Sequence, residues 1–102
     1  MNIITTQEQG ETLKDAVRVF GLDNQIKMLL EELGELVVAA SHYSRGREGS
    51  FDNFVEELAD VAIMLKQMIY ALDCEVPFRL MCEAKINRLQ ERVDDVQRRH
   101  NV

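Results

Sequence analysis

Two stretches decide the fold: residues 29–40, LLEELGELVVAA, and residues 54–65, FVEELADVAIML. In each, apolar residues recur three and four positions apart, which is the period of an amphipathic α-helix. The segment between them, residues 44–50 (SRGREGS), is rich in glycine and serine and predicts a loop. The two stretches therefore predict neighbouring helices, one from about residue 25 to 43 and one from about residue 50 to 72.

Signals outside these stretches predict two further helices. Thr5 and Glu8 have the spacing of a capping box, which would open a first helix that ends at Gly21. Pro77 suits the first turn of a fourth helix, which we expect to run to about Arg99. Strand-like alternation of polar and apolar residues persists nowhere in the chain.

The inner helices are expected to start at polar residues that accept hydrogen bonds from free backbone N–H groups. Asp23 or Asn24 is expected to cap the second helix, and Ser50 or Asp52 the third. With 102 residues, the chain has room for one domain, residues 1–102, with one core. We therefore predict an all-α fold, a four-helix bundle-like pair of hairpins that is completed by oligomerisation.

Charge and composition argue against several functional classes. The net charge of −6 and the pI of about 4.8 disfavour a nucleic-acid-binding protein, because such proteins need a basic face. The most apolar segment, residues 58–72, is too short and too polar to span a membrane, and the first residues do not resemble a secretion signal. Cys74 and Cys82 have no metal-ligand spacing and are expected to be reduced thiols, so we predict a cytoplasmic location.

Each helix of the predicted hairpin carries two acidic residues three positions apart. Glu32 and Glu35 lie in the first stretch, Glu57 and Asp60 in the second, and this spacing puts both carboxylates of a pair on one helical face. At about 100° per residue, Glu57 falls within about 20° of Met64, on the apolar side of its helix. Four carboxylates gathered on apolar faces would repel one another and lose hydration, so they would need a cation.

The ligand chemistry selects the metal. All four side chains offer hard oxygen ligands, and neither helix contains the Glu-x-x-His pattern of a di-iron bundle. Carboxylate ligation favours Mg²⁺, with Mn²⁺ able to substitute for it. The simpler alternative is that the acidic pairs belong to ordinary solvated helix faces. Glu31, next to the first pair, has such an alternative in an ion pair with Lys27, four residues before it.

The acidic pairs resemble the signature of the MazG-like, all-α nucleoside triphosphate pyrophosphohydrolases. That family is recognised by E-x-x-E on one helix and E-x-x-D on the next; here Glu32-x-x-Glu35 is followed after 21 residues by Glu57-x-x-Asp60. The resemblance implies an enzyme that uses Mg²⁺ to cleave the α–β phosphoanhydride of an NTP or dNTP, giving NMP and pyrophosphate. It also implies a role in clearing noncanonical nucleotides or in controlling a nucleotide pool.

Further residues receive expected roles within this resemblance. Glu31 adjoins the first acidic pair and is the candidate general base for the attacking water. Lys85 and Arg88 lie on the fourth predicted helix, where the family often places a lysine and a later arginine, and they are candidate contacts to the triphosphate. The alternative is that these basic side chains simply extend into solvent from the edge of an apolar stripe.

The third predicted helix is apolar around most of its circumference, and one hairpin cannot cover it. We therefore expect a homodimer or a homotetramer, and the resemblance implies the same. The main alternative to an enzyme is a noncatalytic helical oligomer that binds nucleotide or a protein partner. A third interpretation, a metal-free acidic coiled-coil adaptor, is disfavoured because heptads are poorly sustained across the glycines and the loop.

Overall fold

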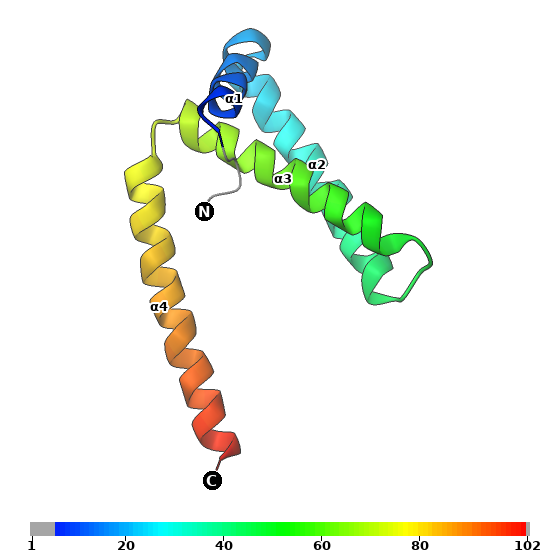
Figure 1. The fold of residues 1–102 in the computed structure, drawn as a ribbon, viewed down its shortest axis with the longest axis vertical. Helices are drawn as coiled ribbons and strands as arrows, with labels where there is room; N and C mark the ends of the chain where they lie inside the picture. Colours follow the sequence, from blue (N-terminus) through cyan, green and yellow to red (C-terminus); the bar gives the residue numbers. More distant parts are fainter. Residues whose placement is uncertain (1–5, 102) are drawn as a thin grey trace.

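The computed structural model describes residues 6–101 and consists almost entirely of helices (Figure 1). The helices are α1 (Gln7–Phe20), α2 (Leu22–Ser44), α3 (Ser50–Ala71) and α4 (Glu75–His100). Residues 6–101 contain no strand, so the predicted all-α fold with four helices is confirmed. None of these four helices combines the length and the apolar character that crossing a membrane requires.

Helix α1 begins with a capping box one residue later than predicted. The Thr6 side-chain oxygen accepts a hydrogen bond from the Gln9 backbone N–H at 3.0 Å, and the Gln9 side chain accepts one from the Thr6 N–H at 3.2 Å. The predicted cap, Thr5, lies outside the described residues, and Glu8 occupies the first turn without forming the box. The reciprocal pair satisfies two backbone donors at the start of the helix.

The turn from α1 to α2 depends on Gly21, whose φ of +90° would be strained for a residue with a side chain. Helix α2 begins directly at Leu22, so the predicted N-cap at Asp23 or Asn24 is wrong. The Asn24 side chain instead donates a hydrogen bond to the Phe20 carbonyl at 2.8 Å. It therefore satisfies an acceptor at the end of α1, whose last carbonyls have no partner within the helix.

Helices α2 and α3 form an antiparallel hairpin joined by residues 45–49 (Figure 1). Gly46 and Gly49 have φ values of +70° and +75°, which lets the chain reverse over a short distance. Gly49 is the N-cap of α3, so the predicted capping by Ser50 or Asp52 is wrong. The Ser50 hydroxyl donates instead to the Arg47 carbonyl, a contact that holds the loop against the start of α3.

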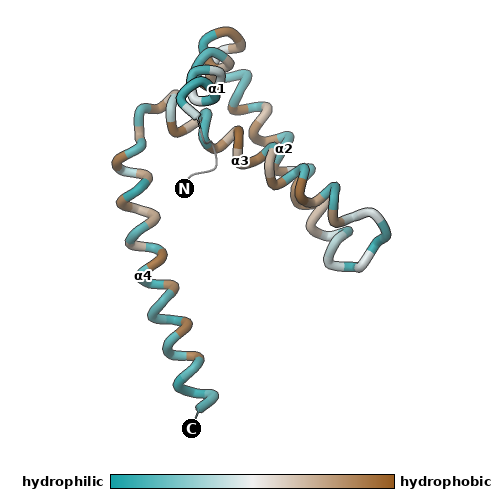
Figure 2. Tube along the Cα trace, viewed as in Figure 1, coloured by the Kyte–Doolittle hydropathy of each residue, from teal (hydrophilic) through white to brown (hydrophobic). Residues whose placement is uncertain are grey.

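The core lies along the α2–α3 seam and where α1 crosses one end of it. The buried apolar side chains of the described chain are few: Leu13, Ala39, Val61, Met64 and Met68. At the crossing, a Cβ built on Gly10 would lie 3.5 Å from the Tyr70 hydroxyl, so α1 packs closely onto α3. So small a core leaves large apolar side chains exposed on every helix, and Figure 2 shows hydrophobic segments on all four helices.

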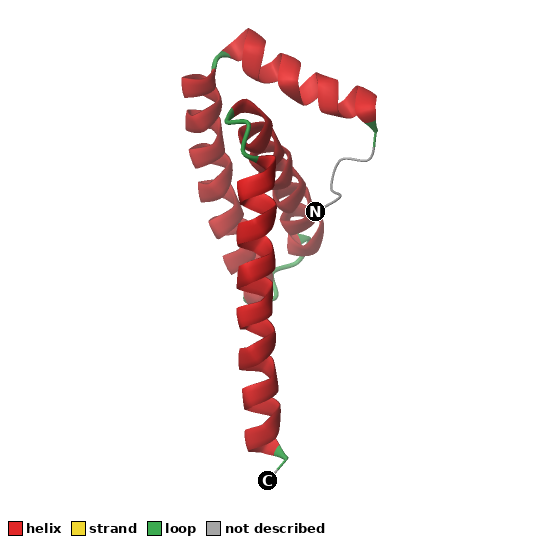
Figure 3. Cartoon of the chain, turned by 90° about the vertical axis from the view of Figure 1, so that its left-hand side faces the viewer, coloured by secondary structure: helices red, strands yellow, loops and turns green. Residues whose placement is uncertain are grey.

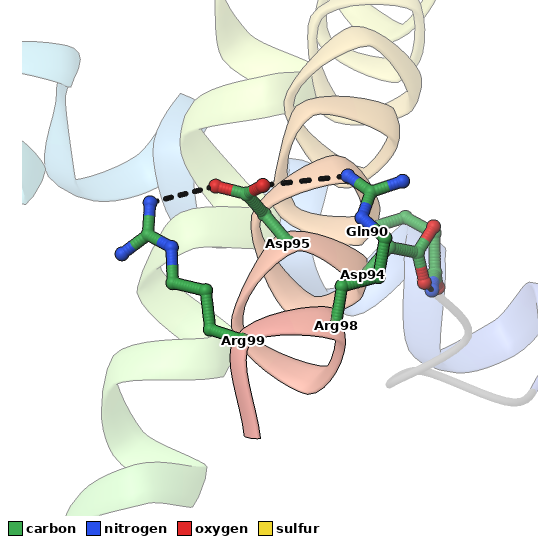
Figure 4. Close-up of polar contacts among 5 residues, drawn as sticks. All are labelled: Gln90, Asp94, Asp95, Arg98 and Arg99. Atoms are coloured by element: carbon green, nitrogen blue, oxygen red, sulfur yellow. Dashed lines mark hydrogen bonds and ion pairs between the residues drawn. The ribbon is translucent and has the colours of Figure 1, made fainter. Parts of the chain in front are cut away.

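Helix α4 packs against no other helix than α3, and most of its length runs away from the hairpin (Figures 1 and 3). None of its residues is buried. Near its end, neighbours along the helix interact instead: Asp95 pairs with Arg98 at 3.3 Å and with Arg99 at 2.9 Å, and Gln90 donates to Asp94 at 2.9 Å (Figure 4). Such pairs stabilise this end of the helix.

The position of α4 makes the chain extended. The radius of gyration is 17.1 Å and the principal dimensions are 57 × 39 × 24 Å. A compact domain of this length has a radius of gyration of about 13 Å. The α2–α3 hairpin is therefore closed, whereas the second hairpin, formed by α3 and α4, is open within one chain.

Candidate metal centre

Two adjacent helices bring three carboxylates of the predicted site together. Glu32 and Glu35 come from α2 and Glu57 comes from α3. One oxygen from each carboxylate lies within 4.8 Å of one from each of the other two. The i, i+3 spacing places both α2 acids on one face, and the register of the hairpin brings Glu57 to them. Within residues 6–101, no other group of acidic, histidine or cysteine side chains converges in this way.

The three carboxylates differ in their access to water. Glu32 and Glu57 are half-buried, and in each of them the Oε2 atom is shielded from water and has no hydrogen-bond partner. Glu35 is exposed at the rim of the cluster. A polar atom that loses water without gaining a partner costs free energy. The two shielded oxygens therefore distinguish this cluster from an ordinary solvated acidic face.

Lost hydration and mutual repulsion raise the pKa of two of these groups. The pKa of Glu32 lies above its ordinary value of 4.5, first because of lost hydration and then because of the charges of Glu35 and Asp60. The pKa of Glu57 is raised by lost hydration and then by the charges of Glu35, Asp60, Glu32 and, least, its neighbour Glu56. No basic side chain contributes to either shift. The local field is therefore negative, and it favours a bound cation.

Asp60 contributes its charge to this field without belonging to the converging group. It is half-buried on α3, one turn after Glu57, and its charge raises the pKa of both Glu32 and Glu57. It does not belong to the group whose oxygens all lie within 4.8 Å of one another. The structure thus gathers three of the four predicted ligands closely, and metal ligation by Asp60 stays a prediction.

The residues of the cluster fit a hard divalent cation. The converging ligand atoms are all carboxylate oxygens, without histidine nitrogen or cysteine sulfur. Mg²⁺ and Mn²⁺ both prefer oxygen ligands. Two of the carboxylates also carry a shielded oxygen that a cation would satisfy. Glu32, Glu35 and Glu57 could therefore hold such an ion.

Glu31 lies beside the cluster but not in it. The side chain is exposed on α2, about 100° around the helix from its neighbour Glu32. In the described part of the chain it makes no ion pair with Lys27, so the simple salt-pair interpretation is not observed. The predicted role of Glu31 as a general base stays a prediction.

Lys85 and Arg88 are exposed on α4 and do not reach the carboxylates of their own chain. Neither forms an ion pair among the described residues, and neither affects the pKa of Glu32 or Glu57. Helix α4 contacts only α3 and then runs away from the hairpin (Figure 1). Their predicted contact with a triphosphate stays a prediction.

Two glutamines are buried in the α2–α3 seam, and the sequence patterns did not predict their burial. Gln25 of α2 is 7% exposed and Gln67 of α3 is 6% exposed, and the Gln67 Oε1 atom has no hydrogen-bond partner. Each is seven residues from an acidic residue, Glu32 or Asp60, and so shares its helical face two turns away. The only sequence signal is an amide at an apolar repeat position, which is weak because glutamine is common on exposed helix faces.

Comparison with known protein families, with curated proteins and with solved structures found no match to this chain. The resemblance to the MazG-like enzymes therefore depends on the two acidic pairs and their apolar surroundings. The convergence of Glu32, Glu35 and Glu57 is an observation independent of that resemblance.

Proposed function

We propose that the chain is an Mg²⁺-dependent nucleoside triphosphate pyrophosphohydrolase. The reaction is hydrolysis of the phosphoanhydride between the α and β phosphates of an NTP or dNTP, which releases NMP and pyrophosphate. Its purpose would be to clear noncanonical nucleotides or to control a nucleotide pool in the cytoplasm. The family resemblance of the acidic pairs supports the reaction class, and the carboxylate cluster supports the metal.

One observation carries the proposal: Glu32, Glu35 and Glu57 converge within 4.8 Å, and two of them have a shielded oxygen without a partner. Carboxylates that gather and lose hydration are stabilised when a cation binds between them. A triphosphate is itself strongly negative, so a site of this sign can bind it only through a cation. The cluster therefore suits a substrate that arrives with, or binds to, a divalent metal.

The residues of the chain would divide the work as follows. Glu32, Glu35 and Glu57 would hold the metal, with Asp60 adding negative charge close by. When bound, Mg²⁺ supplies Lewis-acid polarisation of phosphate oxygens and screens their charge. The exposed Glu31 carboxylate would take the proton of the attacking water. Because the metal ligands sit on two packed helices and not on loops, their relative positions are well defined.

We also propose that the active form is a homodimer or a homotetramer. Phosphate groups beyond the reach of the metal need cationic partners, and the candidates Lys85 and Arg88 lie away from their own chain's carboxylates. A second chain would have to bring them there. Mixing Glu57→Gln protein with Arg88→Ala protein tests this: each variant alone should be inactive, and mixed oligomers should regain part of the activity.

A nucleotide panel tests the proposed reaction. The purified chain is incubated with each common NTP and dNTP in excess Mg²⁺, and pyrophosphate is measured. We expect release from at least one nucleotide, and its loss in EDTA. Glu57→Gln should lower kcat/KM by at least about 100-fold, whereas Glu56→Gln, the same charge change at the exposed neighbour, should change it less than about threefold. Full turnover by Glu57→Gln would contradict the assignment.

The second candidate is a noncatalytic helical oligomer that binds nucleotide or a protein partner. One observation favours it: no basic side chain of the described chain contributes to the field at the carboxylate cluster. Titration with a nonhydrolysable triphosphate in Mg²⁺ distinguishes the two. Metal-dependent binding of the analogue, together with no pyrophosphate release from any nucleotide, would establish the noncatalytic interpretation.

A further inference from the structure

The α2–α3 seam contains a second polar feature besides the candidate metal centre. Gln25 of α2 is 7% exposed and Gln67 of α3 is 6% exposed, and neither side chain forms a hydrogen bond within residues 6–101. The Gln67 Oε1 atom is also shielded from water. We call these two residues the amide pair. A polar group withdrawn from water without a partner costs free energy, so packing alone does not explain the pair.

The register of the hairpin places the two glutamines at the same level. Gln25 lies ten residues before Glu35 on α2, and Gln67 lies ten residues after Glu57 on α3. Glu35 and Glu57 meet across the seam, and α2 and α3 are antiparallel (Figure 1). Equal steps away from that contact therefore keep two residues level with each other. Because both glutamines are buried, the amide pair forms a polar layer inside the seam.

Methionines lie between the carboxylates and the amide pair. Met28 of α2 and Met64 of α3 are each three residues from the glutamine of their own helix, on the side of the carboxylates. Met64 is buried, whereas Met28 is 42% exposed and offers an apolar, adaptable surface. The seam thus presents three successive layers: carboxylates, methionines and neutral amides.

This order of layers matches the order of groups in a nucleotide. The phosphates are anionic and need a metal at the carboxylates, the sugar is uncharged, and the edge of the base both donates and accepts hydrogen bonds. A glutamine side chain has one acceptor oxygen and an NH₂ donor, so it can form two parallel hydrogen bonds to such an edge. Glu32 and Gln25 are seven residues apart, which is about 10.5 Å along the helix and comparable to the length of a nucleoside monophosphate.

The surroundings of the amide pair limit how a ligand reaches it. Helix α1 crosses the seam just beyond the pair, where Gly10 approaches Tyr70, three residues after Gln67 (Figure 1). A ligand that extends from the carboxylates past the amides would therefore meet α1. Within the pair, only Gln67 Oε1 is sealed from water without a partner. The terminal amide torsion is weakly restricted, so a half-turn brings Oε1 to the position of Nε2 and presents it to a ligand.

We propose that the amide pair is the base-recognition subsite for the nucleotide whose phosphates the carboxylate cluster binds through its metal. The Gln67 Oε1 atom accepts a hydrogen bond from a ring N–H or an exocyclic amino group of the base, and an amide N–H of the pair donates to a neighbouring acceptor of the base. Gln25 and Gln67 are then specificity-determining residues. This inference rests on the nucleotide binding of the proposed function, and it does not require hydrolysis.

Titration calorimetry with nonhydrolysable α,β-methylene analogues of the common NTPs and dNTPs, in excess Mg²⁺, tests the subsite. Wild type should bind its preferred nucleotide at least about tenfold more tightly than one with a different base. Gln67→Met keeps the shape of the side chain and removes its hydrogen-bonding atoms, so it should reduce this preference to less than about threefold. Inorganic tripolyphosphate, which has no base, should bind equally to both proteins. Gln97→Met, the same change at an exposed glutamine of α4, should behave as wild type.

Thermal unfolding separates recognition from packing. Gln67→Met replaces an unpartnered buried amide with an apolar group of similar size, so it should melt at the same temperature as wild type or higher. Loss of base preference in a variant that is at least as stable as wild type is a result that a merely structural glutamine would not give. Gln25→Met should also lower the preference, and it keeps the test decisive if Gln67→Met does not fold.

A base preference that both methionine variants leave unaltered would overturn the proposal. Wild-type protein that binds no nucleotide, or that binds tripolyphosphate as tightly as any nucleotide, would overturn it too. Base-selective binding that the variants lose, without pyrophosphate release by wild type, would support the amide pair and contradict the hydrolase. Pyrophosphate release with a base preference that the variants retain would do the reverse.

Discussion

Replacement of Glu57 by glutamine should have opposite effects in the absence and presence of metal. Glutamine keeps the shape of the side chain and removes its charge. Glu57 lies with Glu32 and Glu35 in the group whose oxygens are within 4.8 Å, and Asp60 adds a further negative charge. Without a divalent cation, the neutral amide relieves repulsion, so Glu57→Gln should melt at a higher temperature than wild type.

The metal supplies the opposite effect. For a site of about 1 mM affinity, about 10 mM Mg²⁺ stabilises the native state by about 1.4 kcal/mol. In a domain of this length, each kcal/mol corresponds to about 4–8 °C, so wild type should gain about 6–11 °C. Glu57→Gln lacks one of the three converging carboxylates, one of the two with a shielded oxygen, and should gain less than about 2 °C.

Thermal unfolding followed by circular dichroism, in EDTA and in MgCl₂, measures both effects. Glu56→Gln is the matched control, because it removes one charge from the exposed neighbouring position and should keep the wild-type response to Mg²⁺. If Glu57→Gln melts below wild type in EDTA, or gains as much as wild type from Mg²⁺, the carboxylates do not form a strained cluster that binds metal.

Three further predictions concern pH, glycines and the core. Metal-free protein should lose stability as the pH rises above about 4.5, because Glu32 and Glu57 have raised pKa values and the native state holds protons that the unfolded chain has released. Urea titrations in EDTA measure this, and a stability that rises with pH in wild type and in Glu57→Gln alike would contradict it. Gly34→Ala should raise the free energy of unfolding by about 1 kcal/mol, because Gly34 lies inside α2 and a Cβ there meets no atom within 4 Å. Gly21→Ala should lower the free energy of unfolding by about 1 kcal/mol, because the φ of Gly21 is +90°. Urea unfolding measures both, and equal effects would show that the two glycines do not differ in backbone conformation in this way. Met68→Ala should cost about 2–5 kcal/mol, because Met68 belongs to a very small buried core, and a loss below about 1 kcal/mol would place it outside that core.

The helices follow from local patterns. Apolar periodicity predicts α2 and α3. Gly21 marks the end of a helix because glycine can adopt a positive φ, and Pro77 marks the start of one because proline restricts φ. The errors lie at the caps of α1, α2 and α3. In α2 and α3 the N-cap is a glycine with a positive φ, Gly21 or Gly49, and no nearby polar side chain caps the helix; in α1 the N-cap is Thr6, one residue after the predicted one.

The candidate metal centre is partly predictable for the same reason. Periodicity puts Glu32 and Glu57 on the apolar faces of their helices, and these are the two residues with shielded oxygens. Their separation cannot be read from either helix alone, because it depends on the register between α2 and α3. That register brings Glu35 into the closest group and leaves Asp60 outside it.

By itself the sequence determined the four helices, the loop between α2 and α3 and the faces that carry the acids, since each depends on residues a few positions apart. Only the tertiary structure decided the direction of α4. The apolar face of α4, formed by Cys82, Ile86, Leu89, Val93 and Val96, has the same periodicity whether it packs on its own chain or on another, so periodicity alone cannot choose between them. In the structure the link at residues 72–74, where Asp73 has a φ of +50°, turns α4 away from the hairpin and leaves this apolar face uncovered.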